Sequence, residues 1–317
     1  MAVLVTGGAG FIGSHLCERL AAAGRRLVIV DDFNDYYAPA LKRANAAAAQ
    51  AAGDVTVAEG DIRDARFLEG VFDAEDFRTV VHLAARAGVR PSLVDPHLYF
   101  DVNVRGTLNL LELARARGVE RFIFASSSSV YGAGRDVPFR EDSCADRPVS
   151  PYGASKRCGE LVVYNYHHLY GLKCVALRFF TVYGPRQRPD MAIHKFTRLI
   201  SAGRPVPFYG DGTSARDYTY IDDIIDGVVA AIDSGLGFDI VNLGDSSPVT
   251  LVHIVDTISR AVGRPAILER REDQPGDVPI TYADISKAAG LLNYRPKVAF
   301  QEGIRRFVEW YNKAREL

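Results

Sequence analysis

The chain has 317 residues, of which 48% are hydrophobic and 24% charged, and its formal net charge is −1. This composition is ordinary for a globular protein with a buried core. The near-neutral charge argues against a nucleic-acid or membrane-surface binder, which would need a basic field. Because no run approaches 18 apolar residues, no transmembrane helix is expected.

The cysteines and the first residues indicate a compartment. The four cysteines show no Cys-x-x-Cys motif and no cluster with histidine: Cys17, Cys144, Cys158 and Cys174. The N-terminal stretch lacks the length and the basic flank of a signal peptide. We therefore expect a reduced, cytoplasmic chain without structural zinc or another metal site.

Short apolar segments alternate with amphipathic segments of helix length over the first 180 residues. From their Val, Ile and Phe content, buried strands are predicted at residues 2–5, 27–30, 55–58, 79–83, 121–125 and 173–178. Helices are predicted at residues 11–23, 38–52, 65–71, 96–117 and 151–170. This alternation implies right-handed crossovers and a parallel sheet covered on both faces, the doubly wound Rossmann type of α/β fold.

The pattern changes after about residue 180. Frequent prolines and glycines interrupt regular secondary structure in the next segment. Later helices are predicted at 222–233, 250–261 and 301–314. We therefore predict a Rossmann domain over residues 1–180, to which some later segments return. A smaller α/β substrate domain over residues 181–317 is expected to close over the sheet.

The first predicted strand ends in a glycine-rich turn. Gly7, Gly10 and Gly13 recur at three-residue spacing and lead into the first helix. Glycines there permit a tight turn and close approach to a pyrophosphate, whose charge the helix N-terminus stabilises. Asp31, at the end of the second strand, is placed to accept the ribose hydroxyls of NAD and to repel the extra phosphate of NADP. The alternative is a purely structural glycine turn, but the full context favours NAD.

Other residues are assigned to the same NAD site from their places after later strands. Asp61 follows the third strand, where it either contacts adenine or caps the next helix. Small residues after the fourth strand let the cofactor lie against the backbone. The further predicted NAD contacts are Phe11, Ile12, Asn34, Ile62, Leu83, Ala84, Ala85, Asn103, Tyr152, Lys156 and Phe179.

Tyr152 and Lys156 form the one Tyr-x-x-x-Lys motif of the chain. Their spacing places an ammonium and a phenol one helical turn apart on one face. A positive charge beside a phenol favours the phenolate and lowers its pKa from about 10. Such a phenolate is a general base for a sugar hydroxyl. A Tyr and a Lys four residues apart can occur by chance in a chain of this composition. The prediction therefore depends on the surrounding motifs.

Five motifs occur together and in order along the chain. They are the glycine loop and the segments 82–85 (HLAA), 126–132 (SSSSVYG), 152–156 (YGASK) and 178–185 (RFFTVYGP). Together they resemble the extended short-chain dehydrogenase/reductase family, and within it the nucleotide-sugar epimerases. Segments similar to UDP-glucuronate 4-epimerases lie at 32–37 (DFNDYY), 186–191 (RQRPDM), 216–223 (RDYTYIDD) and 274–278 (QPGDV).

The resemblance implies NAD-dependent epimerisation at carbon 4 of a UDP-sugar through a 4-keto intermediate, with UDP-glucuronate as the expected substrate. It implies that Ser127 is the catalytic hydroxyl, Tyr152 the base and Lys156 its electrostatic partner. The side chains expected near the sugar carboxylate are Ser128, Ser129, Thr181 and Arg188. For Arg188, a pyrophosphate contact or a surface charge is an equal alternative to carboxylate binding.

The resemblance also implies contacts to UDP and between subunits. Phe208 is assigned to uracil, Arg216 and Arg271 to the phosphates, and Asp277 to the uridine ribose. Gln274 stands where many epimerases of the superfamily have Arg before Pro-Gly-Asp, a departure that fits the glucuronate branch. Segments 96–117 and 151–170 resemble the helix pair that forms a homodimer contact in this family.

The residues around Ser127 distinguish competing functions. Relatives that dehydrate or decarboxylate nucleotide sugars usually carry an acid just after this position, whereas Ser128 and Ser129 stand here, which favours epimerisation. Ser126 is expected to bond to local backbone. A UDP-glucose or UDP-N-acetylglucosamine 4-epimerase would share every catalytic residue and is the main alternative. A decarboxylase or a non-catalytic NAD-sensing protein is less favoured, the latter because the Tyr and Lys are both present.

Overall fold

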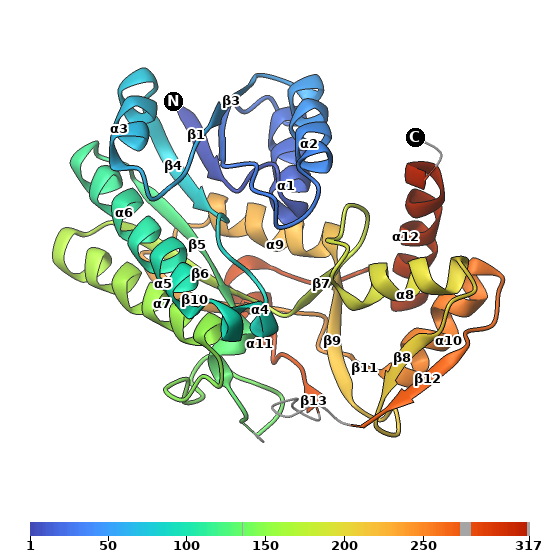
Figure 1. Cartoon of the computed structure of the whole chain (residues 1–317). Helices are drawn as coiled ribbons and strands as arrows, with labels where there is room; N and C mark the ends of the chain where they lie inside the picture. The colour runs from blue at the N-terminus through green and yellow to red at the C-terminus, as the bar shows by residue number, and fades with distance from the viewer. Residues whose placement is uncertain (135, 273–279, 316–317) are drawn as a thin grey trace.

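The computed structural model describes residues 1–134, 136–272 and 280–315, and its centre is a parallel sheet (Figure 1). The sheet has seven strands in the order β10-β6-β5-β4-β1-β2-β3. These are β1 (Ala2–Thr6), β2 (Leu27–Asp31), β3 (Val55–Glu59), β4 (Phe77–His82), β5 (Arg121–Ser127), β6 (Lys173–Phe179) and β10 (Phe238–Leu243). The strand order reverses between β1 and β4, where α/β sheets bind ligands at the carboxyl ends of their strands.

Helices cover both faces of this sheet, as the alternating sequence predicts. One face packs against α1 (Phe11–Ala22), α2 (Pro39–Ala52) and α9 (Ile221–Asp233), and the other against α3 (Ala65–Ala74), α6 (Gly106–Ala116) and α7 (Pro151–Tyr170). Strand β1 shows the alternation: Val3 and Val5 belong to the first core, whereas Ala2 and Leu4 belong to the second. The predicted doubly wound α/β fold is therefore confirmed.

The elements predicted in the first 180 residues are confirmed to within about three residues, with one change in the helix predicted at 96–117. That segment contains α5 (Pro96–Phe100), a π-helical turn (Asp101–Arg105) and then α6. The side chain of Asn103 in this turn bonds to both backbone groups of Arg86. A further short helix, α4 (Val89–Val94), lies where no element is predicted.

Most of the later elements form a smaller lobe beside the carboxyl edge of the sheet (Figure 1). They are β7 (Thr181–Tyr183), α8 (Ala192–Ser201), β8 (Val206–Tyr209), β9 (Ala215–Tyr220), β11 (Pro248–Thr250), α10 (Leu251–Val262), β12 (Leu268–Arg271), β13 (Ile280–Thr281) and α12 (Phe300–Arg315). Strand β10 instead joins the main sheet beside β6, and α11 (Ser286–Leu292) contacts it. The three helices predicted after residue 180 are confirmed as α9, α10 and α12. The domain division at residue 180 stays a prediction.

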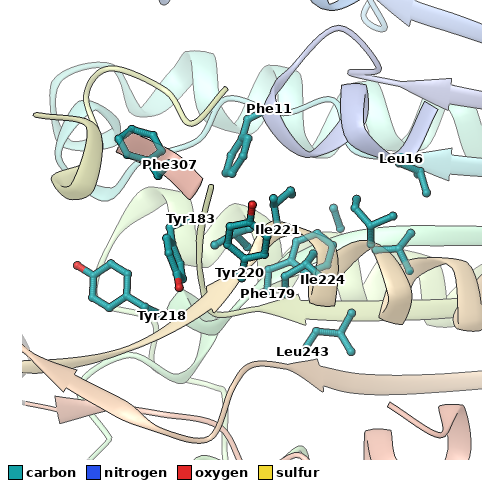
Figure 2. Packing of buried hydrophobic residues seen from close by; sticks show 14 of the residues in the cluster. Phe11, Leu16, Phe179, Tyr183, Tyr218, Tyr220, Ile221, Ile224, Leu243 and Phe307 are labelled. Carbon is teal, nitrogen blue, oxygen red and sulfur yellow. The ribbon is translucent and has the colours of Figure 1, made fainter. Parts of the chain in front are cut away.

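The lobe and the sheet share one continuous core. Figure 2 shows Tyr183 of β7 and Tyr220 of β9 next to each other, below Phe307 of α12 and Phe11 of α1. Aromatic edge contacts join these layers, and the ring centroids of Tyr183 and Tyr220 lie 5.6 Å apart. Because the core crosses from sheet to lobe, the lobe is held against the carboxyl edge where the cleft lies.

The described residues contain no helix that is long and apolar enough to cross a membrane. All four cysteines are free, with Cys17 and Cys174 buried and Cys144 exposed. In the described part of the chain, no group of three or more His, Cys, Asp or Glu side chains is arranged to hold a metal ion.

Candidate active site

A cleft of about 400 Å³ opens at the carboxyl edge of the sheet. Its walls come from the turns after β1 to β5, from the start of α7 and from the segment after β6. Every residue assigned above to NAD lines this cleft except Asn103. The side chain of Asn103 is buried and bonds to Arg86 and to the Ser155 hydroxyl, so it supports the wall from behind.

The glycine turn is packed so closely that side chains cannot fit at two of its positions. A Cβ at Gly13 would lie 2.1 Å from the carbonyl oxygen of Gly7, and one at Gly7, whose φ is +70°, would lie 2.6 Å from the amide nitrogen of Ala84. At Gly10 the one described atom within 4 Å would be that same Gly7 oxygen, at 3.1 Å. No side chain caps the N-terminus of α1, so its first amides remain available to an anion.

Asp31 ties the glycine turn to the loop after β2. Its carboxylate accepts the amide N–H groups of Ala9, at 3.1 Å, and Phe33, at 3.0 Å. Burial raises the pKa of Asp31, while these bonds and the charge of Lys42 oppose the rise. The Lys42 ammonium is held by the backbone and side-chain oxygens of Asn34. Each Asp31 oxygen accepts one of these two amides and can accept a further donor, and Asp31 lines the cleft.

Asp61 lines the cleft but does not cap the following helix. The N-cap of α3 is Asp64, whose side chain accepts the amide of Phe67, so the capping alternative for Asp61 is wrong. Asp61 accepts the amide of Arg63 at 2.8 Å and pairs with the Arg63 guanidinium. Its contact with adenine stays a prediction.

Tyr152 and Lys156 both lie on α7, and Ser127 ends β5. The N-cap of α7 is Ser150, whose hydroxyl accepts the amide N–H of Gly153, and Pro151 is the first residue of the helix. This start directs Tyr152 into the cleft, where its ring meets the ring of Tyr99 edge to face. The Lys156 ammonium is buried and donates to the carbonyl oxygen of Ala125 at 2.7 Å.

The charges around Tyr152 differ from those that the motif alone suggests. Burial raises the pKa of Tyr152, and the opposing groups are a hydrogen bond with Ser127 and the positive charge of Arg188. The role of Lys156 as the electrostatic partner of Tyr152 stays a prediction. Burial lowers the pKa of Lys156 itself to about 7, despite the nearby charge of Glu160.

Ser126 belongs to a buried polar network, not to the local backbone bonding expected from the sequence. Its hydroxyl donates to Glu160 of α7 at 2.6 Å. The same carboxylate accepts two bonds from Arg178 of β6, at 2.8 and 2.9 Å, and one from Arg157. The network fixes α7 against β5 and β6, so it sets the position of Tyr152 and Ser127 relative to each other.

The residues assigned to the sugar carboxylate all line the cleft: Ser128, Ser129, Thr181 and Arg188. Ser129 donates its amide to the Ser127 hydroxyl at 3.2 Å. Arg188 is paired with Asp190 and lies over the ring of Tyr36, 5.6 Å from its centroid. Tyr36, Lys42, Arg86 and Met191 also line the cleft, although the sequence analysis gave none of them a role.

Three residues assigned to UDP do not line this cleft. Phe208 is buried in β8 beneath Arg270, and Arg271 pairs with Glu269 on β12. The Arg216 guanidinium donates to the carbonyl oxygen of Ala215 at 2.9 Å. Asp277 and Gln274 lie outside the described residues. These assignments to UDP therefore stay predictions.

Comparison with known proteins identifies the class. The family model described as GDP-mannose 4,6 dehydratase matches residues 4–307. The chain therefore belongs to this dehydratase-like branch of the short-chain dehydrogenase/reductase family, which confirms the resemblance drawn from its motifs.

Curated relatives and solved structures narrow the comparison. The UDP-glucuronate 4-epimerase of Thermodesulfobacterium geofontis is 44% identical over 315 residues, which cover 99% of this chain and 97% of that one. UDP-glucuronate 4-epimerase 1 of Arabidopsis thaliana is 42% identical over 98% of this chain and 76% of its own length. The Bacillus cereus UDP-glucuronic acid 4-epimerase, in complex with UDP-glucuronic acid and NAD, has a TM-score of 0.92 at 36% identity, covering 99% of this chain and 100% of that one. The Thermus thermophilus UDP-glucose 4-epimerase in complex with NAD has a TM-score of 0.90 at 36% identity and the same coverage.

Proposed function

We propose that this chain is an NAD-dependent UDP-sugar 4-epimerase, an isomerase that interconverts UDP-glucuronate and UDP-galacturonate through a transient 4-keto sugar. The observation that carries the proposal is the meeting of Tyr152, Ser127 and Arg188 in the cleft that the glycine turn also lines. The similarity to UDP-glucuronate 4-epimerases of bacteria and plants supports the same choice.

The protein groups in the cleft fit NAD. The glycine turn, which lines the cleft, and the uncapped start of α1 suit the pyrophosphate, and the carboxylate of Asp31 suits the adenosine ribose hydroxyls. NAD, when bound, takes up the hydride of carbon 4 and returns it. We expect Lys156 to hold the nicotinamide ribose, because it lines the cleft one helical turn after Tyr152.

Tyr152 is the general base of the proposed reaction. It takes the proton of the sugar 4-hydroxyl, and Ser127 hydrogen-bonds the same oxygen and fixes its direction. The 4-keto sugar then turns in the cleft and presents its other face, and Tyr152 gives the proton back. Ser128 and Ser129 stand where a dehydratase would need an acid to protonate a leaving hydroxyl.

The proposed intermediate must also keep its carboxylate. A 4-keto uronate is a β-keto acid, which loses carbon dioxide when the carboxylate bond aligns with the carbonyl. We propose that Ser128, Ser129, Thr181 and Arg188, which all line the cleft, hold the carboxylate out of that alignment by hydrogen bonding.

A UDP-glucose 4-epimerase is the second candidate, and one observation favours it. The charge of Arg188 is already balanced by Asp190, so a neutral hydroxymethyl group would not leave that cation unpaired. The similarity to the Thermus thermophilus UDP-glucose 4-epimerase points the same way.

The partners of the chain follow from the same proposal. We expect a UDP-sugar ligand and a homodimer formed through α6 and α7, because α7 exposes Leu161, Tyr164 and Leu169 to solvent. The four free cysteines fit a reducing compartment such as the cytoplasm. Light scattering of the purified protein would measure the mass of the assembly.

The test of the function is product identification. Purified protein with NAD is incubated separately with UDP-glucuronate and with UDP-glucose, and the sugars are identified by chromatography and NMR. We expect UDP-galacturonate from the first substrate, and its absence would overturn the substrate assignment. Tyr152→Phe should lower turnover about 100-fold or more with an unchanged circular dichroism spectrum. Tyr170→Phe, which changes an exposed tyrosine at the other end of the same helix, is the matched control and should keep full activity.

A further inference from the structure

Asp190 binds one edge of the Arg188 guanidinium. The Nε and Nη2 groups of Arg188 donate to the two carboxylate oxygens of Asp190, at 3.0 and 3.1 Å. The ring of Tyr36 lies against the same guanidinium, with its centroid 5.6 Å from the central carbon. The carboxylate of Asp190 thus fixes the rotation of the cation over this ring.

The opposite edge of Arg188 is left for another partner. A guanidinium has five N–H donors, and the Nε edge uses two of them. Among the described residues, no acceptor is bonded to Nη1 of Arg188. Arg188 lines the cleft whereas Asp190 does not, so the edge away from Asp190 is the one directed toward the space beside Tyr152.

We propose that Asp190 is a positioning residue for sugar selection, which holds the Nε edge of Arg188 so that the Nη1 edge receives a carboxylate on carbon 5 of the sugar. The inference rests on the proposed function, because it assigns the substituent that the same site recognises. Two parallel bonds from the Nη1 edge match the geometry of a carboxylate, and a hydroxymethyl group cannot accept both. Asp190 itself does not touch the sugar.

The geometry distinguishes this role from simple charge balance. The side chain of Asp190 is 46% exposed, so water could solvate Arg188 on that side if neutralisation were the sole need. A bidentate partner two residues away instead limits the guanidinium to one plane. In Asp190→Asn, the amide offers one acceptor and turns its NH2 group toward an N–H of Arg188, so the plane is no longer fixed.

The experiment measures binding, not turnover. In a Tyr152→Phe background with NAD present, calorimetry gives the Kd of UDP-glucuronate, UDP-glucose and UDP. Adding Asp190→Asn should weaken UDP-glucuronate about tenfold and leave the other two ligands within about twofold. Asp190→Glu, which keeps a carboxylate, should restore part of the loss. The matched control is Asp142→Asn, because Asp142 pairs with Arg140 at the same two-residue spacing but away from the cleft.

The outcomes separate this proposal from the proposed function. Equal weakening of all three ligands would mean that Asp190 only supports the fold, and no weakening of UDP-glucuronate would mean that Arg188 needs no positioning. Either result overturns the inference. A failure of the proposed function appears elsewhere, as a parent enzyme that forms no 4-epimer from UDP-glucuronate.

Discussion

Replacing Glu160 with glutamine should destabilise the protein strongly, because its carboxylate is the centre of a buried network. The carboxylate accepts bonds from Ser126 at 2.6 Å, from Arg178 at 2.8 and 2.9 Å, and from Arg157 at 2.9 Å. The side chains of Glu160 and Arg178 are 0% and 2% exposed. Among the described atoms, Nη1 of Arg178 has no hydrogen-bond partner, so this cation depends on Glu160.

The expected loss follows from what glutamine cannot accept. Its single oxygen replaces two, and its NH2 group meets an N–H donor of Arg178 or Arg157. Removing one partner of a buried ion pair costs about 3–5 kcal/mol, because the other charge stays buried. For a chain of this size we expect the Tm to fall by about 5–8 °C.

The pH dependence of this loss has a definite sign. Burial alone would raise the pKa of Glu160, but the hydrogen bonds and charge of Arg178 outweigh burial and hold it below 4.5. A carboxyl whose folded pKa is depressed stabilises the fold fully above its unfolded pKa and loses that effect as the pH falls through the folded value. The gap in unfolding free energy between wild type and Glu160→Gln should therefore be constant near pH 7 and narrow below pH 4.5.

Urea and thermal unfolding at pH 7 and pH 4, followed by circular dichroism, measure the difference in unfolding free energy between wild type and Glu160→Gln. Glu120→Gln, which removes an exposed pair with Arg78, should leave the unfolding midpoint nearly unchanged. Replacing both Glu160 and Arg178 with methionine should recover much of the loss. A cost below about 1 kcal/mol for Glu160→Gln would contradict the reasoning, since an exposed pair behaves in that way.

Two further substitutions test the cleft. Burial lowers the pKa of Lys156 from 10.5 to about 7, so between these values the unfolded chain binds more protons and the free energy of unfolding should rise with pH. Lys156→Met should remove that rise. If urea titrations from pH 7 to 9.5 gave the same slope of unfolding free energy against pH for wild type and Lys156→Met, the reasoning would be wrong. In Gly13→Ala, the Cβ would meet backbone atoms of Gly7 and Gly8, so NAD content and stability should both fall. Gly70→Ala, in open space on another helix, should be neutral or stabilising by about 0.5–1 kcal/mol.

The sequence predicts the sheet and the first half of the site because their signals are local. The spacing of Gly7 and Gly13 is visible in the sequence and indicates a tightly packed turn. Glycine is required there because a Cβ at either position would clash with backbone atoms. Ser150 and Pro151 likewise mark the start of α7, which places Tyr152. Hydrophobic runs identify buried strands for the same reason, because a parallel sheet buries both of its faces.

The features that the sequence leaves open depend on partners far away in the chain. The π-helical turn at Asp101–Arg105 contains no proline or glycine, and Asn103 instead bonds to the backbone of Arg86. From the sequence, Ser126 is expected to bond to the local backbone of a loop. Its hydroxyl instead bonds to Glu160, which lies 34 positions away in the chain. Propensity and periodicity cannot report such contacts, because tertiary structure decides them.

The ionisation of Tyr152 depends on more groups than the one that the helical spacing of Tyr and Lys indicates. The burial that raises the pKa of Tyr152 also lowers that of Lys156 to about 7, and the Lys156 ammonium is held by Ala125. The groups of the protein that favour the phenolate are Ser127 and Arg188. Because Arg188 is also the cation proposed to receive the sugar carboxylate, one guanidinium links activation of the base to selection of the sugar. Asp190, which orients that guanidinium, therefore acts on both.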